Sequence, residues 1–209
     1  MKLGLMLSPM ATANTTRHLA MAFHSYAPDG VTIRELPLGE VPVQPPYEDM
    51  PIPAGATAWK QQISEVDGLV VVVRARTRSV PGHLKIGIDW ASQPEPVNAV
   101  RGKPCLVVAV GEGRRPSFLA LQHARTVLTD AGANVQKRPD YAIVLNPDSF
   151  TPDGFVADRD LSDTITELLD SAAGFSSHQL RIAALDVPEV APPAPVILPP
   201  SRRPVGPVL

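Results

Sequence analysis

Two valine-rich runs constrain this 209-residue chain more than any other feature. Residues 68–73 read GLVVVV and residues 105–110 read CLVVAV, and neither run alternates between apolar and polar side chains. A strand that is apolar on both faces is typical of a parallel sheet that helices cover on both sides. Both runs are much shorter than the roughly 18 residues that a membrane-spanning helix needs. They therefore predict the central strands of an α/β protein.

The segments around these runs alternate between strand-like and helix-like patterns. Apolar segments predict further strands at 2–7 and 31–36, and a weaker fifth strand falls within 133–145. Helical patterns lie at 16–26, at 59–66, after Pro81, at 117–131 and at 161–173. Such alternation, with connections long enough to hold a helix, predicts a flavodoxin-like, doubly wound parallel sheet of five strands.

Composition excludes several classes of function. The chain has 19 Lys and Arg residues against 21 Asp and Glu residues, so it lacks the basic excess that general binding to nucleic acids or anionic membranes needs.

The first ten residues are too few and too weakly basic to be a signal peptide, and we expect a cytoplasmic protein. The histidines lack the short spacing of a metal site, so no metal ligand is predicted. The single cysteine, Cys105, is interpreted as a buried hydrophobe rather than a reactive thiol.

Two proline-rich segments fall outside the alternating pattern. Residues 39–55 carry five prolines and predict an ordered but irregular connection. Residues 187–209 carry eight prolines and predict an extended C-terminal tail, so the folded domain is expected to cover 1–180. Because this tail keeps several Val, Ile and Leu residues, two interpretations stay open: a flexible tail, or an arm that packs on its own chain or on a partner.

Ligands of open parallel sheets bind beyond the carboxyl ends of the strands. The loops at 8–16, 74–81 and 111–117 are therefore the candidate site. The first loop offers four short polar side chains ahead of a helix, namely Thr12, Asn14, Thr15 and Thr16. These side chains predict either a phosphate site at the helix N-terminus or, more simply, a helix cap.

The loop after the third strand carries arginines two residues apart, at Arg74, Arg76 and Arg78. If this loop stays extended, its period of two places all three guanidinium groups on one face. Three interpretations are open: a solvated face, a cradle for the phosphate of a flavin or nicotinamide cofactor, or a docking edge for an acidic surface of a second chain.

The loop after the fourth strand contributes glycines and further arginines. Gly111 and Gly113 would let the backbone approach a ligand closely. Arg114 and Arg115 follow them, so five arginines are expected to converge at this edge. In a chain of slightly acidic net charge, such a concentration indicates an anion-binding mouth.

One motif carries a family resemblance. Residues 79–94, SVPGHLKIGIDWASQP, resemble the S-[IV]-P-G-x-L-K-N-A-I-D-W signature of the NADPH-dependent FMN reductase family, and the resemblance extends over roughly residues 1–175. Within the motif, Leu84, Ile88 and Trp90 are also expected to be core residues, and Lys85 and Asp89 to form a surface pair.

The resemblance implies that FMN binds at the strand ends, with its phosphate in the first loop and its ring against the loop after the third strand. A nicotinamide from NADPH or NADH then passes a hydride to the flavin, and a small-molecule acceptor takes the electrons. No catalytic side chain is required, because the flavin carries the chemistry. The resemblance also implies a homodimer or a pairing with a related chain. The implied cofactor-binding residues are Ser8, Thr12, Asn14, Thr15, Thr16, Arg76, Thr77, Arg78, Gly111 and Gly113.

Two loops depart from the family pattern. The first loop lacks the glycine and arginine of the pattern G-S-x-R-x-x-S-x-N, and the pattern P-E-Y-N-G-S is replaced by RARTRS at 74–79. Two functions therefore stay open. The chain is either an NAD(P)H-dependent flavin or quinone reductase that uses FMN, or a flavodoxin-like subunit with weakened or lost FMN binding that acts as a non-catalytic interaction partner.

Overall fold

The computed structural model describes residues 1–44, 46, 51–146 and 148–185. The proline-rich tail expected at 187–209 lies outside the described residues. The strands are β1 (Lys2–Leu7), β2 (Thr32–Glu35), β3 (Gly68–Arg74), β4 (Pro104–Gly111), β5 (Asn134–Val135) and β6 (Tyr141–Val144). The α-helices are α1 (Ala13–Ser25), α2 (Ala54–Ser64), α3 (Gly82–Ser92), α4 (Arg114–Asp130) and α5 (Arg159–Ala184), with short 3₁₀ turns η1 (Leu38–Glu40) and η2 (Glu95–Val97).

The strands form one parallel sheet in the order β2-β1-β3-β4-β5, and β6 also pairs with β4. The two valine-rich runs are neighbours at its centre, where Val71 pairs with Val107. This order confirms the flavodoxin-like architecture expected from the alternating pattern.

The expected fifth strand is confirmed in position but is split in two. β5 pairs with Pro104 and Cys105, whereas β6 pairs with residues 108–111 farther along the same strand. Pro139 lies between the two segments, and its lack of an N–H group is incompatible with continuous ladder pairing.

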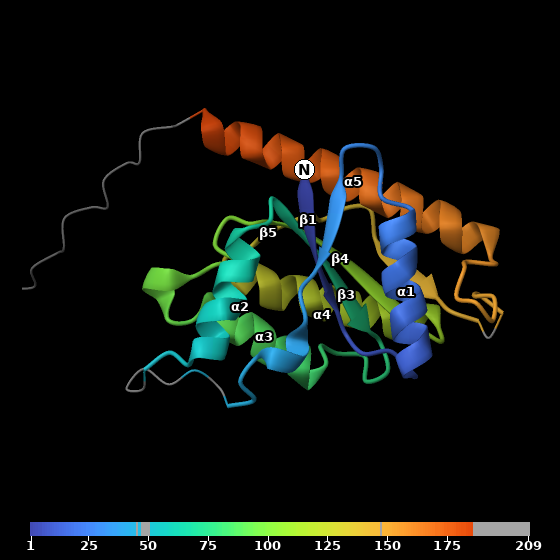
Figure 1. Cartoon of the computed structure of the whole chain (residues 1–209), viewed down its shortest axis with the longest axis horizontal. Helices are drawn as coiled ribbons and strands as arrows, with labels where there is room; N and C mark the ends of the chain where they lie inside the picture. The colour runs from blue at the N-terminus through green and yellow to red at the C-terminus, as the bar shows by residue number, and fades with distance from the viewer. Residues whose placement is uncertain (45, 47–50, 147, 186–209) are drawn as a thin grey trace, which may run out of the picture.

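Helices cover both faces of the sheet, and this explains why the valine-rich runs do not alternate. Helices α2, α3 and α4 lie on one face, and α1 and α5 lie on the other (Figure 1). Val71 and Val107 pack in the first core, while Val72 and Val108 pack in the second. Successive side chains of a strand point to opposite faces, so a sheet covered twice needs apolar residues at every position.

Several expectations about individual core residues are confirmed. Leu84, Ile88 and Trp90 are buried, and Lys85 pairs with Asp89 on the surface of α3. Cys105 is fully buried, and burial raises the pKa of its thiol to about 12. A thiol with such a pKa is protonated at neutral pH and is therefore a poor nucleophile.

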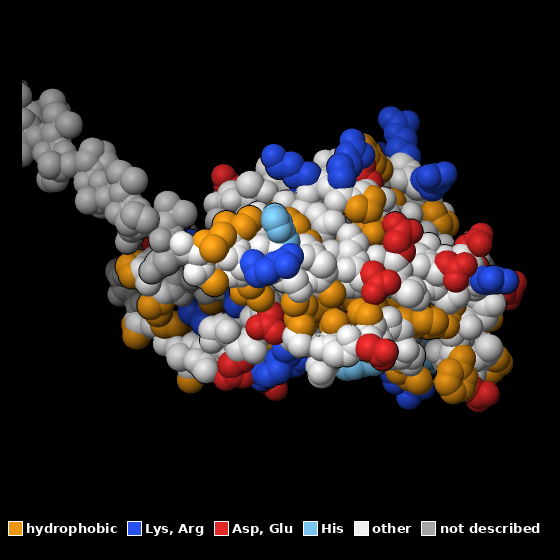
Figure 2. Space-filling model, turned by 90° about the horizontal axis from the view of Figure 1, so that it is seen from above, with side chains coloured by type: hydrophobic (Ala, Val, Ile, Leu, Met, Phe, Trp, Pro, Cys, Tyr) orange, Lys and Arg blue, Asp and Glu red, His pale blue; other side chains and the backbone are white. Residues whose placement is uncertain are grey.

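The helices differ from their expected limits mainly at α5. This helix continues to Ala184, beyond the expected end at 173, and Ser176 on the extra turns packs against Gly68 at the start of β3. Its last turns leave Leu180, Ile182 and Leu185 exposed, and Figure 2 shows apolar side chains at this end of the molecule. None of the helices in the described ranges combines the length and apolar character that a membrane crossing needs.

The connection expected to be irregular at 39–55 is confirmed as such for the residues described between η1 and α2. It is attached to the core by Trp90, whose indole N–H donates to the carbonyl oxygens of Pro42 and Gln44, at 3.0 and 2.8 Å. Residues 54 and 55 already belong to α2.

Replacement of Gly68 by alanine should destabilise the fold. An added Cβ would collide with Ser176 Oγ and would lie 3.1 Å from Ser176 Cβ and 3.2 Å from a methyl carbon of Leu3, so the Ser176 side chain has to rotate and its surroundings have to move. We expect Gly68→Ala to lower the free energy of unfolding by about 1–3 kcal/mol in urea titrations. The loss should be smaller in a Ser176→Ala background. Gly39→Ala is the control, because nothing lies within 4 Å of its added Cβ, and an equal loss there would contradict the explanation.

Lys60 should make stability depend on pH. This side chain is buried on α2, its Nζ donates to the carbonyl oxygens of Ala91 and Val97, and burial lowers its pKa to about 8 from 10.5. Between these two values the folded protein has lost a proton that the unfolded chain still holds, so the free energy of unfolding rises with pH. We expect the wild type to gain stability relative to Lys60→Met from pH 8 to 10 in urea titrations. Parallel curves for the two proteins would contradict this.

Candidate functional site

A hollow of about 410 Å³ opens at the carboxyl ends of the central strands. The three loops expected to form the site all contribute to it or adjoin it. Its lining residues are Ala11, Arg74, Ala75, Arg76, Gly111, Glu112, Gly113 and Pro116.

The first loop combines an unpaired hydroxyl with a well-capped helix. Ser8 is fully buried, and its Oγ has no hydrogen-bond partner among the described residues. Thr12 is the N-cap of α1, and its Oγ1 accepts a hydrogen bond from the Thr15 amide at 3.0 Å. This confirms the capping interpretation for Thr12. The amides of Ala13 and Asn14 remain at the helix N-terminus, where the helix dipole favours an anion.

Thr16 fixes the shape of the same loop. Its Oγ1 accepts from the Met10 amide at 2.8 Å and donates to the Thr12 carbonyl oxygen at 2.9 Å. Arg74 holds the loop from the other side, because its Nη1 donates to the Met10 carbonyl oxygen at 3.0 Å. The first loop is thus tied to both its own helix and the end of β3.

The arginine loop is not extended, so the expectation that three guanidinium groups share one face is wrong. β3 ends at Arg74, and the Arg78 amide donates to the Ala75 carbonyl oxygen at 3.3 Å, which closes a turn. The turn breaks the period of two. Arg74 and Arg76 line the hollow, whereas Arg78 does not belong to its lining.

Arg78 has a backbone conformation that side chains rarely adopt. Its φ is +60°, and among the described residues it is the one non-glycine residue with a positive φ. This position matches the glycine of the P-E-Y-N-G-S pattern. The turn therefore keeps a geometry suited to glycine while it carries an arginine, at a cost in stability.

The arginines at this edge lack acidic partners. Arg74, Arg76 and Arg78 form no ion pair with the described residues, whereas Arg34, Arg101 and Arg125 elsewhere in the chain do. Glu112 also lines the hollow, so the lining has two guanidinium groups against one carboxylate. The site is therefore locally positive although the chain is slightly acidic.

The loop after β4 has a packing role as well. A Cβ on Gly111 would lie 2.9 Å from the Cβ of Ala75 and 3.0 Å from Ser117 Oγ, so glycine is needed there for close contact between the two loops. A Cβ on Gly113 would meet Pro116 alone, at 3.6 Å or more, so this position is open.

The expected convergence of five arginines is wrong. Arg114 lines a different hollow, of about 460 Å³, together with Asn146, Asp158 and Asp160 near the start of α5. Residues 114 and 115 already belong to the first turn of α4. The geometry of the helix therefore sets the direction of their side chains, which the sequence pattern had placed in a loop.

Two features of the site were not anticipated from the sequence. The first is that Glu112 lines the hollow, which its position between two glycines at a strand end could have indicated. Ser79 Oγ lies 2.8 Å from His123 Nδ1, which ties the arginine loop to α4. These residues are 44 positions apart, and sequence spacing alone carries no sign of such a pair.

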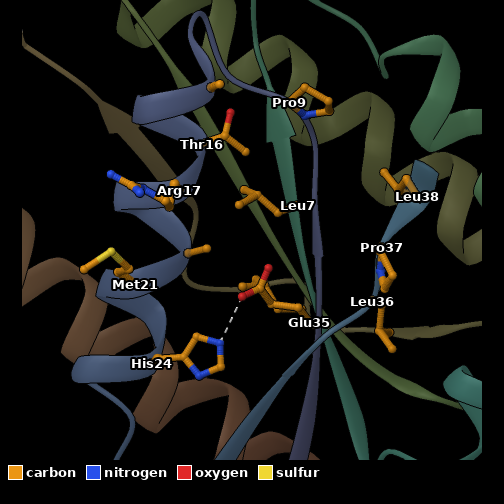
Figure 3. Close-up of a pocket in the computed structure, with 13 residues that line it drawn as sticks. Leu7, Pro9, Thr16, Arg17, Met21, His24, Glu35, Leu36, Pro37 and Leu38 are labelled. Carbon is orange, nitrogen blue, oxygen red and sulfur yellow. Dashed lines mark hydrogen bonds and ion pairs between the residues drawn. The ribbon is translucent and has the colours of Figure 1, made fainter. Parts of the chain in front are cut away.

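A second hollow, of about 480 Å³, lies between α1 and the edge strand β2 (Figure 3). Its walls are mostly apolar, and they include Leu7 of β1 and Met21 of α1. His24 and Glu35, 3.3 Å apart, pair between the helix and the strand. This groove is slightly larger than the strand-end hollow, but its lining has no glycine and one arginine, Arg17. The strand-end hollow has two glycines and two arginines at the carboxyl ends of the strands, so we take it as the candidate site.

The described part of the chain holds no group of three or more His, Cys, Asp or Glu side chains arranged for a metal ion.

Comparisons with known proteins agree on one family. A family model described as NADPH-dependent FMN reductase matches residues 1–147. A 2-hydroxy-1,4-benzoquinone reductase from Burkholderia sp. is 26% identical over 175 residues, which cover 84% of this chain and 96% of that protein. A quinone reductase from Escherichia coli strain K12 is 30% identical over 145 residues, which cover 69% of this chain and 75% of that protein.

A solved structure agrees on the fold. The flavoenzyme NAD(P)H:(acceptor) oxidoreductase FerB from Paracoccus denitrificans superposes with a TM-score of 0.73 at 21% sequence identity. The match covers 85% of this chain and 97% of FerB. At this identity the likeness concerns the fold.

Replacement of Arg78 by glycine should stabilise the protein. Glycine adopts a positive φ without the steric cost that a side chain has, so we expect Arg78→Gly to raise the free energy of unfolding by about 1 kcal/mol. Thr77→Gly is the matched control in the same turn. It should lower the free energy of unfolding by about 0.4–1 kcal/mol, because it only adds freedom to the unfolded chain. Urea titrations of both variants test this, and a destabilised Arg78→Gly would contradict it.

Proposed function

Because this chain belongs to the NADPH-dependent FMN reductase family, we propose that it is an NAD(P)H-dependent oxidoreductase that uses FMN and reduces a quinone-type acceptor. The observation that carries this proposal is the family match over residues 1–147, which spans all three loops around the strand-end hollow. No observation favours the non-catalytic interaction subunit.

The residues at the first loop fit a phosphate group. Ser8 Oγ is a buried hydroxyl that lacks a partner, and such a group costs stability unless a ligand pairs with it. The α1 N-terminus adds free amides, and the Arg74 guanidinium adds a positive charge beside Met10. We propose that Ser8, Asn14 and Thr15 contact the phosphate, while Thr12 and Thr16 hold the loop in shape.

The residues around the hollow fit a flat ring. Gly111 and Gly113 leave part of the lining without side chains, and Ala75 and Arg76 of the arginine loop line the hollow beside them. We propose that Arg76, Thr77 and Arg78 border the ring on the side where the family pattern has tyrosine, asparagine and glycine. The chemistry that FMN supplies when bound is hydride transfer from NAD(P)H to the acceptor.

The role of the protein is therefore to position the cofactor and its substrates. The bonds of Thr16 and Arg74 to Met10 fix the first loop, and the Ser79–His123 contact fixes the arginine loop. Loops fixed in this way would hold a bound flavin in one orientation, which would lower the barrier without any acid or base from the protein.

Three features of the sequence stay proposals. We propose that residues 1–180 form the reductase domain and that residues 187–209 form a separate tail. We further propose a homodimer, or a pairing with a related chain, and a cytoplasmic location.

The Ser8 hydroxyl gives a sharp test of the cofactor site. Ser8→Ala should raise the free energy of unfolding of the flavin-free protein by about 1 kcal/mol, because it removes a buried unpaired hydroxyl. The same change should weaken FMN binding about tenfold in a fluorescence titration, because the phosphate loses a donor. Ser92→Ala is the control: Ser92 is also buried but is already bonded within α3, so FMN binding should not change.

A wild-type protein that neither binds FMN nor oxidises NADPH when FMN and a quinone are supplied would overturn the proposed function. Tight FMN binding in Ser8→Ala would instead overturn only the assignment of Ser8 to the phosphate.

A further inference from the structure

We propose that the electron acceptor is an anionic quinone, with an ionised hydroxyl or carboxylate on its ring, and that Arg76 and Arg78 select it. This inference rests on the proposed function. It specifies the class of acceptor, and it assigns to the rewritten arginine loop a role in choosing that acceptor.

The position of Arg76 indicates which ligand meets it. Arg76 lines the same hollow as the glycines at 111 and 113, so it borders the place proposed for the flavin ring. Whatever exchanges electrons with the ring has to lie against it. In NADPH the 2′-phosphate is separated from the nicotinamide by two riboses and a diphosphate, so it lies far from the ring. A positive charge beside the ring therefore lies closer to the acceptor than to the 2′-phosphate of NADPH.

The charge balance of the hollow favours an anion there. Arg76 and Arg78 form no ion pair with the described residues, and Arg74 donates to a neutral carbonyl oxygen, so its charge is not compensated. Glu112 is the one acidic residue in the lining and balances one of the two guanidinium groups. A neutral quinone would leave the remaining charge unpaired, whereas an ionised hydroxyl beside a quinone carbonyl presents two oxygens that match a guanidinium fork.

The strain at Arg78 supports a role for its side chain. Its φ of +60° suits glycine, and the P-E-Y-N-G-S pattern has glycine there. An arginine at this position costs stability without forming an ion pair or a side-chain hydrogen bond with the described residues. The exposed side chain of Arg78 can reach a ligand at the rim, and we infer that it acts on one there.

The overall reaction balances for such an acceptor. NADPH supplies two electrons and one proton as a hydride, and water supplies a second proton. The quinone becomes the hydroquinone and keeps its ionised substituent, while NADPH becomes NADP⁺. The arginines take no part in proton transfer; they hold the anion against the ring.

A matched pair of acceptors tests this proposal. 2-Hydroxy-1,4-naphthoquinone is a vinylogous acid that is ionised at neutral pH, and 2-methoxy-1,4-naphthoquinone has a similar shape but cannot ionise. The measured quantity is the ratio of kcat/KM for the hydroxy compound to kcat/KM for the methoxy compound, with NADPH and saturating FMN. A variant that only weakens FMN binding lowers both rates and leaves this ratio unchanged.

We expect Arg76→Gln to lower the ratio about tenfold and Arg78→Gly to lower it several-fold. The control is Arg181→Gln, which makes the same change in charge on the exposed end of α5 and should leave the ratio unchanged. The wild-type ratio should also fall as salt is added, because ions screen the attraction, and it should fall less in Arg76→Gln.

Three outcomes overturn the proposal. If the wild type reduces both naphthoquinones and the arginine variants keep its ratio, the acceptor inference fails while the proposed function stands. If the wild type binds no FMN and reduces neither compound, the proposed function fails and the inference fails with it. Arginine variants that keep the ratio but change the sedimentation coefficient would assign the loop to a protein partner instead.

Discussion

Burial of the β3–β4 pair on both faces is the constraint on which the rest of this structure depends. Val71 and Val107 serve one core, Val72 and Val108 serve the other, and each contact needs helices on its own side of the sheet. A parallel pair covered twice can be connected only by crossovers, which bring the loops after β1, β3 and β4 to one edge. The candidate site is a consequence of this arrangement, because the loops that follow parallel strands all begin at the same edge of the sheet.

The site combines a turn that matches the family pattern with a lining that departs from it. The turn after β3 holds Arg78 at a φ suited to glycine, and Ser79 holds that turn against α4 through His123. The buried, unpaired Ser8 hydroxyl is likewise unfavourable in the isolated chain. Strain and unpaired polar groups of this kind are typical of sites where a ligand completes the interactions. They support the proposal that this site binds a ligand.

Sequence reasoning reached the fold more easily than the lining of the site. The parallel sheet and the two-sided core follow from the apolar pattern, and the motif at 79–94 identified the family. The arginine loop was harder to predict, because the hydrogen bond between Arg78 and Ala75 closes a turn that a period-of-two pattern does not reveal. Arg114 was likewise expected at the same rim, but the first turn of α4 carries it to another hollow.

The sequence by itself determined the class of sheet, the position of the ligand edge and the kind of residue found there, because burial and chain reversal depend on local composition. Tertiary structure alone decided which of those residues share a cavity. Glu112 lines the same hollow as Arg74 and Arg76, whereas Arg114 lines a different hollow. Ser79 contacts His123, which is 44 positions away in the sequence. The physical reason is that a side chain's direction depends on the turn or helix that carries it, and on contacts with segments that are distant in the chain.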